Sequence, residues 1–154
     1  MTLQQRFSKP LDELKAIANS SFVHYKHGAC LLRGGKVYAF GKNKYFDRVY
    51  EMRKNIKFTV HAEIDAIMSY PKHELKGMDI MIIRVKKDGS LGDSRPCNTC
   101  IEKMRKAGIR RAYYSNRDGG LSCELVSEME LTYETSAMRV WARLRGHITP
   151  STVI

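Results

Sequence analysis

The sequence predicts a single α/β domain with three layers, in which helices cover both faces of a central sheet. A length of 154 residues is enough for one hydrophobic core and too short for two comfortable ones. The composition, 43% hydrophobic and 28% charged, is typical of a soluble globular protein. Helical and strand patterns alternate along the chain, and no repeat or linker-like tract divides residues 1–154. We therefore expect one domain over the whole chain.

The first predicted elements are a helix and a β-hairpin. The helix is expected over residues 10–19, where Pro10 can occupy the opening turn and the apolar positions fall on one face. Two short strands within residues 29–41 flank Gly34-Gly35, because adjacent glycines between apolar runs favour a tight turn. After a loop, an apolar stretch that starts at His61 predicts a second helix.

The second half of the chain continues the alternation of strands and helices. Asp79–Val85 is a nearly continuous apolar run, which predicts a central strand covered on both faces. A helix over Asn98–Lys106 is expected to end at Gly108, and a strand is expected over Ile109–Ser115. The spacing of apolar residues in Leu131–Leu144 predicts a last helix with one apolar stripe.

The charge of the chain bears on its partners rather than on its fold. There are 27 Lys and Arg against 16 Asp and Glu, a formal net charge of +11, and such an excess attracts polyanions. No apolar run approaches the roughly 20 residues that a membrane span needs. The first residues also lack the apolar core of a signal peptide. We therefore expect an intracellular, cytoplasmic protein with no membrane partner.

Cysteine and histidine usage narrows the search for chemistry. Of 4 cysteines, Cys97 and Cys100 form a C-x-x-C pair, which in an intracellular protein is more often a metal or redox site than a disulfide. Cys30 lies in an apolar run, where free cysteine behaves as a small core residue, and neither Cys30 nor Cys123 is expected to take part in chemistry. The histidines expected to be ordinary surface or loop residues are His24, His27, His73 and His147.

Two titratable residues, His61 and Glu63, interrupt the apolar stretch at the start of the second predicted helix. Burying such groups costs free energy unless something binds them. The apolar residues around them are expected to be buried and to anchor the helix. These residues are Val60, Ile64, Ile67 and Met68.

Cys97 and Cys100 follow Pro96 at the start of the next predicted helix. Residues three apart lie on one helix face, so both sulfurs can meet one metal ion, and the helix N-terminus favours their thiolate forms. His61, at another helix start, offers an imidazole that suits zinc. Three protein ligands leave a fourth position for water, as in catalytic zinc sites, and Glu63 could take the proton from that water.

The two motifs together resemble a known signature. His61-Ala62-Glu63 and Pro96-Cys97-Asn98-Thr99-Cys100 match the H-x-E and P-C-x-x-C motifs of the zinc-dependent cytidine and deoxycytidylate deaminases and their nucleic-acid-editing relatives. The resemblance covers roughly residues 29–115. It implies a cytidine-deaminase-like three-layer α-β-α fold with a central mixed β-sheet.

The resemblance also implies a mechanism and a set of site residues. The implied ligands of one Zn²⁺ per chain are His61, Cys97 and Cys100. A zinc-bound hydroxide would attack C4 of cytosine while Glu63 shuttles protons, so that uracil and ammonia form. By the same resemblance, Asn43 would contact the sugar, and the backbone N–H of Ala62 would lie near the base edge.

The signature indicates the reaction more firmly than the substrate. We interpret the sequence as that of an enzyme acting on cytosine within DNA or RNA, because residues 42–58 should border the pocket and interleave basic with aromatic side chains. The candidate residues of this nucleic-acid rim are Lys42, Lys44, Tyr45, Phe46, Arg48, Arg53, Lys54 and Lys57. The alternative for this segment is a short helix whose aromatic residues belong to the core.

Other substrates and roles stay open at this point. The deaminases that the chain resembles include enzymes that convert free dCMP or CMP to dUMP or UMP and enzymes that act on adenosine in transfer RNA. A zinc-binding module without turnover is a further alternative, which Glu63 disfavours because a structural site needs no proton shuttle. The expected partners are a cytosine-containing nucleic acid or nucleotide and, because such proteins are often oligomers, further copies of the chain.

Overall fold

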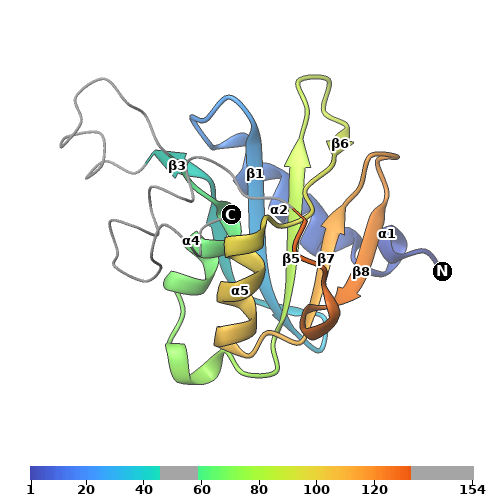
Figure 1. Cartoon of the computed structure of the whole chain (residues 1–154). Coiled ribbons are helices and arrows are strands. Elements are labelled where there is room, and N and C mark those ends of the chain that lie inside the picture. The colour runs from blue at the N-terminus through green and yellow to red at the C-terminus, as the bar shows by residue number, and fades with distance from the viewer. Residues whose placement is uncertain (46–58, 133–154) are drawn as a thin grey trace.

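The computed structural model describes residues 1–45 and 59–132, and its centre is a mixed six-stranded β-sheet (Figure 1). The strands are β1 Lys26–Arg33, β2 Lys36–Lys42, β5 Asp79–Val85, β6 Leu91–Gly92, β7 Arg111–Ser115 and β8 Leu121–Leu125. They lie in the order β2-β1-β5-β7-β8, with β6 paired to β5 beside this path. β5 and β7 run parallel, and the other pairs of the sheet run antiparallel.

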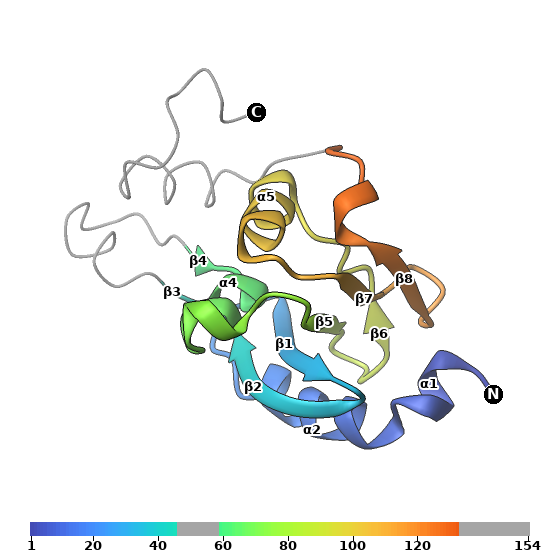
Figure 2. The same ribbon diagram turned by 90° about the horizontal axis from the view of Figure 1, so that it is seen from below.

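Helices flank this sheet on both faces. One face carries α1 (Leu3–Arg6) and α2 (Ser8–Asn19), and the other carries α4 (Ala62–Met68) and α5 (Asn98–Ala107) (Figure 2). The remaining elements are β3 Lys44–Tyr45, β4 Thr59–Val60 and the 3₁₀ turns η1 Lys72–Glu74 and η2 Val126–Glu128. The three-layer α/β fold expected from the sequence is confirmed. Within residues 1–45 and 59–132, no helix combines the length and apolar character needed to cross a membrane.

The alternation of side chains along β5 builds a core on each face of the sheet. Ile80 and Ile82 belong to the core shared with α4 and α5, whereas Met81 and Ile83 belong to the core shared with α2. Consecutive strand residues point to opposite faces, so a strand covered on both sides needs an unbroken apolar run. The predicted strand Asp79–Val85 is therefore confirmed with the same bounds.

Most other predicted elements are present with small shifts of their ends. The hairpin turns at Gly34 and Gly35, whose φ angles of 58° and 80° lie in the region that glycine adopts most easily. α5 ends at Gly108 as expected, and Gly108 has a φ angle of 82°. The strand expected from Ile109 begins at Arg111.

Some features of the fold differ from expectation. The sequence analysis missed β8, because Leu121–Leu125 alternates polar and apolar residues, is only partly covered and forms no apolar run. Leu131 and Thr132 are not helical, and residues 133–144 of the expected last helix lie outside the described residues. Met68 is 55% exposed rather than buried, since α4 ends at this residue and its last side chain is not covered.

α4 packs directly on β2 at Gly41, with no side chain between the two backbones. A Cβ atom at Gly41 would lie 2.4 Å from the Ala66 nitrogen and 2.5 Å from the Ala62 oxygen, both on the backbone of α4. A residue larger than glycine cannot fit so close an approach. Asp65 strengthens the contact, because its carboxylate accepts a hydrogen bond from the Lys42 N–H at 3.1 Å. The position of α4 therefore depends on Gly41.

We expect Gly41→Ala to lower the free energy of unfolding by about 2 kcal/mol, because the added methyl group must push α4 away from the sheet. Thermal unfolding followed by circular dichroism measures the change. Gly92→Ala is the matched control, since its Cβ would meet the flexible Lys86 side chain at 3.2 Å rather than a backbone. Equal melting temperatures for the two variants would contradict the role given to Gly41.

Candidate active site and metal centre

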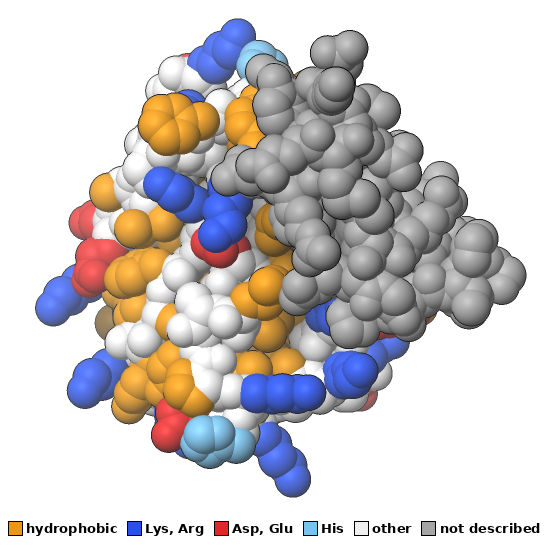
Figure 3. Space-filling model, turned by 90° about the vertical axis from the view of Figure 1, so that its left-hand side faces the viewer, with side chains coloured by type: hydrophobic (Ala, Val, Ile, Leu, Met, Phe, Trp, Pro, Cys, Tyr) orange, Lys and Arg blue, Asp and Glu red, His pale blue; other side chains and the backbone are white. Residues whose placement is uncertain are grey.

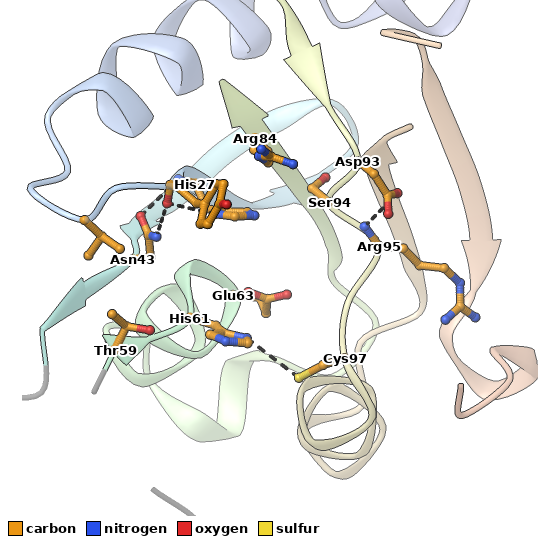
Figure 4. Close-up of a pocket in the computed structure, with 12 residues that line it drawn as sticks. His27, Asn43, Thr59, His61, Glu63, Arg84, Asp93, Ser94, Arg95 and Cys97 are labelled. Carbon is orange, nitrogen blue, oxygen red and sulfur yellow. Dashed lines mark hydrogen bonds between the residues drawn. The ribbon is translucent and has the colours of Figure 1, made fainter. Parts of the chain in front are cut away.

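A cavity of about 440 Å³ opens at the edge of the sheet where α4 and α5 begin (Figure 4). Its volume lies within the range of small-molecule binding sites. The wall combines the start of β1, the residues after β2, the end of β5, the start of α4 and the segment before α5. Residues of this wall used below are His27, Asn43, His61, Glu63, Arg84 and Cys97.

Three possible metal ligands meet at one side of the cavity. His61 is the residue before α4 and Cys97 the residue before α5, and both have extended backbones with ψ of 151° and 170°. Cys100 follows in the first turn of α5. Nδ1 of His61 lies 3.7 Å from Sγ of Cys97 and 3.4 Å from Sγ of Cys100. The ligand atoms of all three residues lie within 4.8 Å of one another.

This donor set fits zinc. Two sulfurs and one imidazole nitrogen are ligands that zinc prefers. Burial lowers the pKa of His61 to about 4, so its ring is neutral at pH 7 and keeps a lone pair for a metal. The predicted grouping of His61, Cys97 and Cys100 is therefore present in the folded chain.

Hydrogen bonds of Ser94 and Arg95 fix the segment that carries Cys97. Ser94 is buried, and its hydroxyl donates to the Ile82 carbonyl at 2.8 Å, while its N–H donates to the Ser115 carbonyl at 2.8 Å. The Arg95 guanidinium forms an ion pair with Glu124 at 3.2 Å. These contacts tie the start of α5 to the sheet, so that Cys97 has a defined place.

Glu63 lines the same cavity as His61 and Cys97 and is only 4% exposed. Burial raises the pKa of its carboxyl group to about 7, although hydrogen bonds from its own N–H and from Cys100 act in the opposite direction. His61 and Glu63 would diverge on a regular helix, where successive residues are rotated by about 100°. They face one cavity because His61 precedes the helix and has an extended backbone. A carboxyl group that can exchange a proton near pH 7 thus lies beside the metal ligands.

Comparison with known families agrees with this geometry. Residues 1–116 match the family model described as the cytidine and deoxycytidylate deaminase zinc-binding region. The chain belongs to this family. It is therefore a zinc-dependent hydrolase that acts on C–N bonds other than peptide bonds, and zinc is the cofactor of this deaminase. No curated protein matched the chain.

Solved structures confirm the fold of the deaminase. A cytidine deaminase from Burkholderia pseudomallei has a TM-score of 0.58 at 20% sequence identity, covering 83% of this chain and 95% of that protein. The diaminohydroxyphosphoribosylaminopyrimidine deaminase/5-amino-6-(5-phosphoribosylamino)uracil reductase of Thermotoga maritima has a TM-score of 0.51 at 18% identity, covering 75% of this chain and 30% of that protein. A dCMP deaminase from the cyanophage S-TIM5 has a TM-score of 0.49 at 20% identity, covering 77% of this chain and 89% of that protein. At this identity, the first two likenesses establish the cytidine-deaminase-like fold alone.

Asn43 and Ala62 lie close to the positions that the sequence predicts for them. Asn43 follows β2 and lines the cavity, where its side-chain oxygen accepts a hydrogen bond from the His27 N–H at 2.9 Å and its amide donates to the Tyr25 carbonyl. Ala62 is the first residue of α4 and is buried. Their contacts with the sugar and the base of a substrate stay predictions.

The structure describes only the first residues of the predicted nucleic-acid rim, Lys42, Lys44 and Tyr45. Asn43 and Thr59, which lie beside the two ends of residues 44–58, both line the cavity, and the expectation that the segment itself borders the cavity stays a prediction. Lys44 forms an ion pair with Asp65 at 2.7 Å, and Tyr45 pairs with Thr59 in the short β3–β4 ribbon. The rim residues outside the described part of the chain are Phe46, Arg48, Arg53, Lys54 and Lys57. The alternative, a short core helix over this segment, lies outside it as well.

The cavity wall also contains residues that the sequence analysis missed. The expectation that His27 is an ordinary surface or loop residue is wrong, because it lies half-buried in β1 and lines the cavity. Arg84 of β5 is its cross-strand neighbour and lines the cavity too. Burial lowers the pKa of His27, so its ring is neutral at pH 7. The available signal was a charged residue, Arg84, that follows the apolar run Ile80–Ile83 within one strand.

We expect Cys100→Ser to lower zinc affinity by about tenfold or more, because a hydroxyl group is a poorer zinc ligand than a thiolate. Inductively coupled plasma mass spectrometry of the purified protein measures the zinc content. Cys123→Ser is the matched control, since Cys123 is exposed on β8 and takes no part in the ligand group. Full zinc occupancy in Cys100→Ser would refute the assignment.

Proposed function

We propose that the protein catalyses the hydrolytic deamination of cytosine to uracil. The observation that supports this most strongly is that the buried carboxyl group of Glu63 lines the same cavity as His61 and Cys97, which form one ligand group with Cys100. A metal site of purely structural use has no need for such a carboxyl group. The non-catalytic zinc module is therefore the weaker reading of this site.

Glu63 would act as the proton shuttle of the reaction. Zinc held by His61, Cys97 and Cys100 supplies, when bound, a water whose pKa is lowered to about 7. Glu63 would accept one proton from the attacking water and deliver it to N3 of the ring, and would then transfer the second proton, from the hydroxyl group now on C4, to the departing amino group. A C–O bond forms at C4 and the C–N bond breaks, so cytosine and water give uracil and ammonia.

We expect Glu63→Gln to lower kcat by about 1,000-fold, because glutamine cannot transfer protons but keeps nearly the same shape. Uracil formation measured by mass spectrometry, together with zinc content, separates loss of proton transfer from loss of metal. Glu102→Gln is the matched control, since Glu102 is an exposed carboxylate of α5 outside the cavity. Substantial residual turnover in Glu63→Gln would remove Glu63 from this role.

Cytosine within nucleic acid is the substrate that we propose. The net charge of +11 favours polyanions, and Lys and Arg side chains are spread over the described part of the face in Figure 3. Phe22 is 89% exposed and directly precedes Val23, which lines the cavity. An exposed ring beside a base pocket suits the stacking of an unpaired base. Lys42, Lys44 and Tyr45 flank Asn43 of the cavity wall and add two basic side chains, of which Lys44 is paired with Asp65, and a second ring.

A free nucleotide such as dCMP or CMP is the second candidate substrate. The cavity of about 440 Å³ can enclose one small molecule. A free nucleotide needs such an enclosing site more than a polymer does, because a polymer can also bind along the surface. The family description also names cytidine and deoxycytidylate. No observation favours adenosine in transfer RNA as the substrate, and the assay below tests it.

We expect the protein to form uracil in a single-stranded oligonucleotide with a higher kcat/KM than in dCMP or CMP. The assay compares these substrates with duplex DNA, RNA and transfer RNA, and mass spectrometry detects uracil or inosine. Duplex DNA should react more slowly, because the target base must first be unstacked. Uracil from the monomers alone would reject the polymer and leave the free nucleotide as the substrate.

We expect the double variant Lys42→Ala, Lys44→Ala to bind an oligonucleotide more weakly and with a flatter salt dependence. Each lost phosphate contact should reduce the slope of log K against log salt concentration by about 0.7 for a single strand. Alanine is used because a carboxylate at position 44 would face Asp65. The control is Lys9→Ala, Lys36→Ala, two exposed lysines outside residues 42–58. An unchanged slope in the first variant would exclude these lysines from the rim.

A further inference from the structure

Arg84 places a cation in the cavity wall that forms no ion pair with a described residue. It lies in β5 between His27 of β1 and Gly92 of β6, and its side chain lines the cavity. Its Nε atom is buried and has no hydrogen-bond partner in the described part of the chain. The guanidinium carbon lies 4.7 Å from the centre of the Tyr25 ring. A buried donor without a partner is costly, and a charged one especially so.

The charged groups around this guanidinium do not supply the missing anion. Arg95 forms an ion pair with Glu124 on β8, and Figure 4 shows its side chain pointing away from Arg84. Asp93 is exposed, and its carboxylate accepts a hydrogen bond from the Arg95 N–H at 3.4 Å. His27 is neutral because burial lowers its pKa. Asp93 lines the same cavity, but no ion pair or hydrogen bond joins it to Arg84, so among the described residues the Arg84 guanidinium has no direct anionic partner.

The metal ligands decide which end of the cavity receives the base. The C–N bond that breaks must lie beside His61, Cys97 and Glu63. Figure 4 shows Arg84 and His27 across the cavity from these residues. In a nucleotide the sugar separates the base from the phosphate, so the phosphate lies farthest from the reacting amino group. A substrate seated for the reaction would extend its phosphate toward Arg84.

We propose that Arg84, held by the Tyr25 ring, binds a phosphate group on the sugar of the target cytosine. The inference rests on the proposed function and deepens it, because it makes Arg84 a residue that selects nucleotides over nucleosides. The phosphate can belong to a free nucleotide or to a nucleic acid chain, since both offer the same oxygens.

The stacking of Arg84 on Tyr25 prepares the guanidinium for this ligand. A ring on one face restrains the side chain by a cation–π contact and leaves the N–H groups in the guanidinium plane available. Guanidinium donors match phosphate oxygens in pairs, with short charge-assisted hydrogen bonds. Such a ligand would supply an acceptor for the buried Nε, which the described residues do not.

Isothermal titration calorimetry of the zinc-loaded protein tests the proposal with three ligands that carry the product base. These are deoxyuridine, dUMP and a short single-stranded oligonucleotide with one internal deoxyuridine. We expect Arg84→Met to lower the affinity for the phosphate-bearing ligands by about 10- to 100-fold and to leave the affinity for deoxyuridine unchanged. Arg84→Lys should lose less affinity for these ligands, because lysine keeps the positive charge but lacks the paired N–H donors. Arg117→Met, which removes an exposed arginine between β7 and β8, is the matched control.

The outcomes separate the source of the phosphate from the validity of the proposal. A loss of affinity for dUMP alone supports a free nucleotide, and a loss for the oligonucleotide supports a phosphate of the chain. No loss for either, or an equal loss for deoxyuridine, overturns the proposal. Because these ligands bind without turnover, the result stands apart from any failure to deaminate cytosine. If Arg84→Met misfolds, as judged by circular dichroism and zinc content, Tyr25→Leu replaces it and should selectively weaken the same phosphate-bearing ligands.

Discussion

The directions of three neighbouring strands are the constraint on which the site depends. β2 runs antiparallel to β1, and β1 runs antiparallel to β5, so β2 and β5 point the same way. α4 comes after β2 and α5 after β5, with both helices on one face of the sheet. Their first residues therefore meet at a single edge, at the carboxyl ends of the two strands, where open α/β sheets bind ligands. The parallel partner β7 then requires that α5 cross over the sheet.

Burial acts on the titratable groups of this edge in one direction. It lowers the pKa of His61 and of His27 and raises the pKa of Glu63, so each moves toward its uncharged form. Arginine cannot lose its proton in this way, and Arg84 keeps its charge. The cavity thus has a neutral ligand and a proton-exchanging carboxyl group at one end and a fixed cation at the other. A molecule with an uncharged ring and an anionic tail matches this arrangement.

The sequence was sufficient for the part of the site that lies in local motifs. His61, Glu63, Cys97 and Cys100 each stand at a fixed spacing near a helix start, and the apolar run of β5 marks a strand covered on both faces. His27 and Arg84 could not be found this way, because the register of β1 on β5 brings them together and spacing along the chain does not encode register. β8 was not predicted for a related reason. Its residues are only partly buried and form no apolar run, and it is a strand because it pairs with β7.

The β3–β4 ribbon joins the described residues on either side of 46–58. Lys44 pairs with Val60 and Tyr45 with Thr59, so residues 45 and 59 lie side by side. The ribbon leads into α4, which begins at Ala62, two residues after β4 ends. The chemistry is anchored separately, at Gly41 and in the first turns of two helices. The geometry of the metal ligands therefore depends on a few backbone contacts at positions far apart in the sequence.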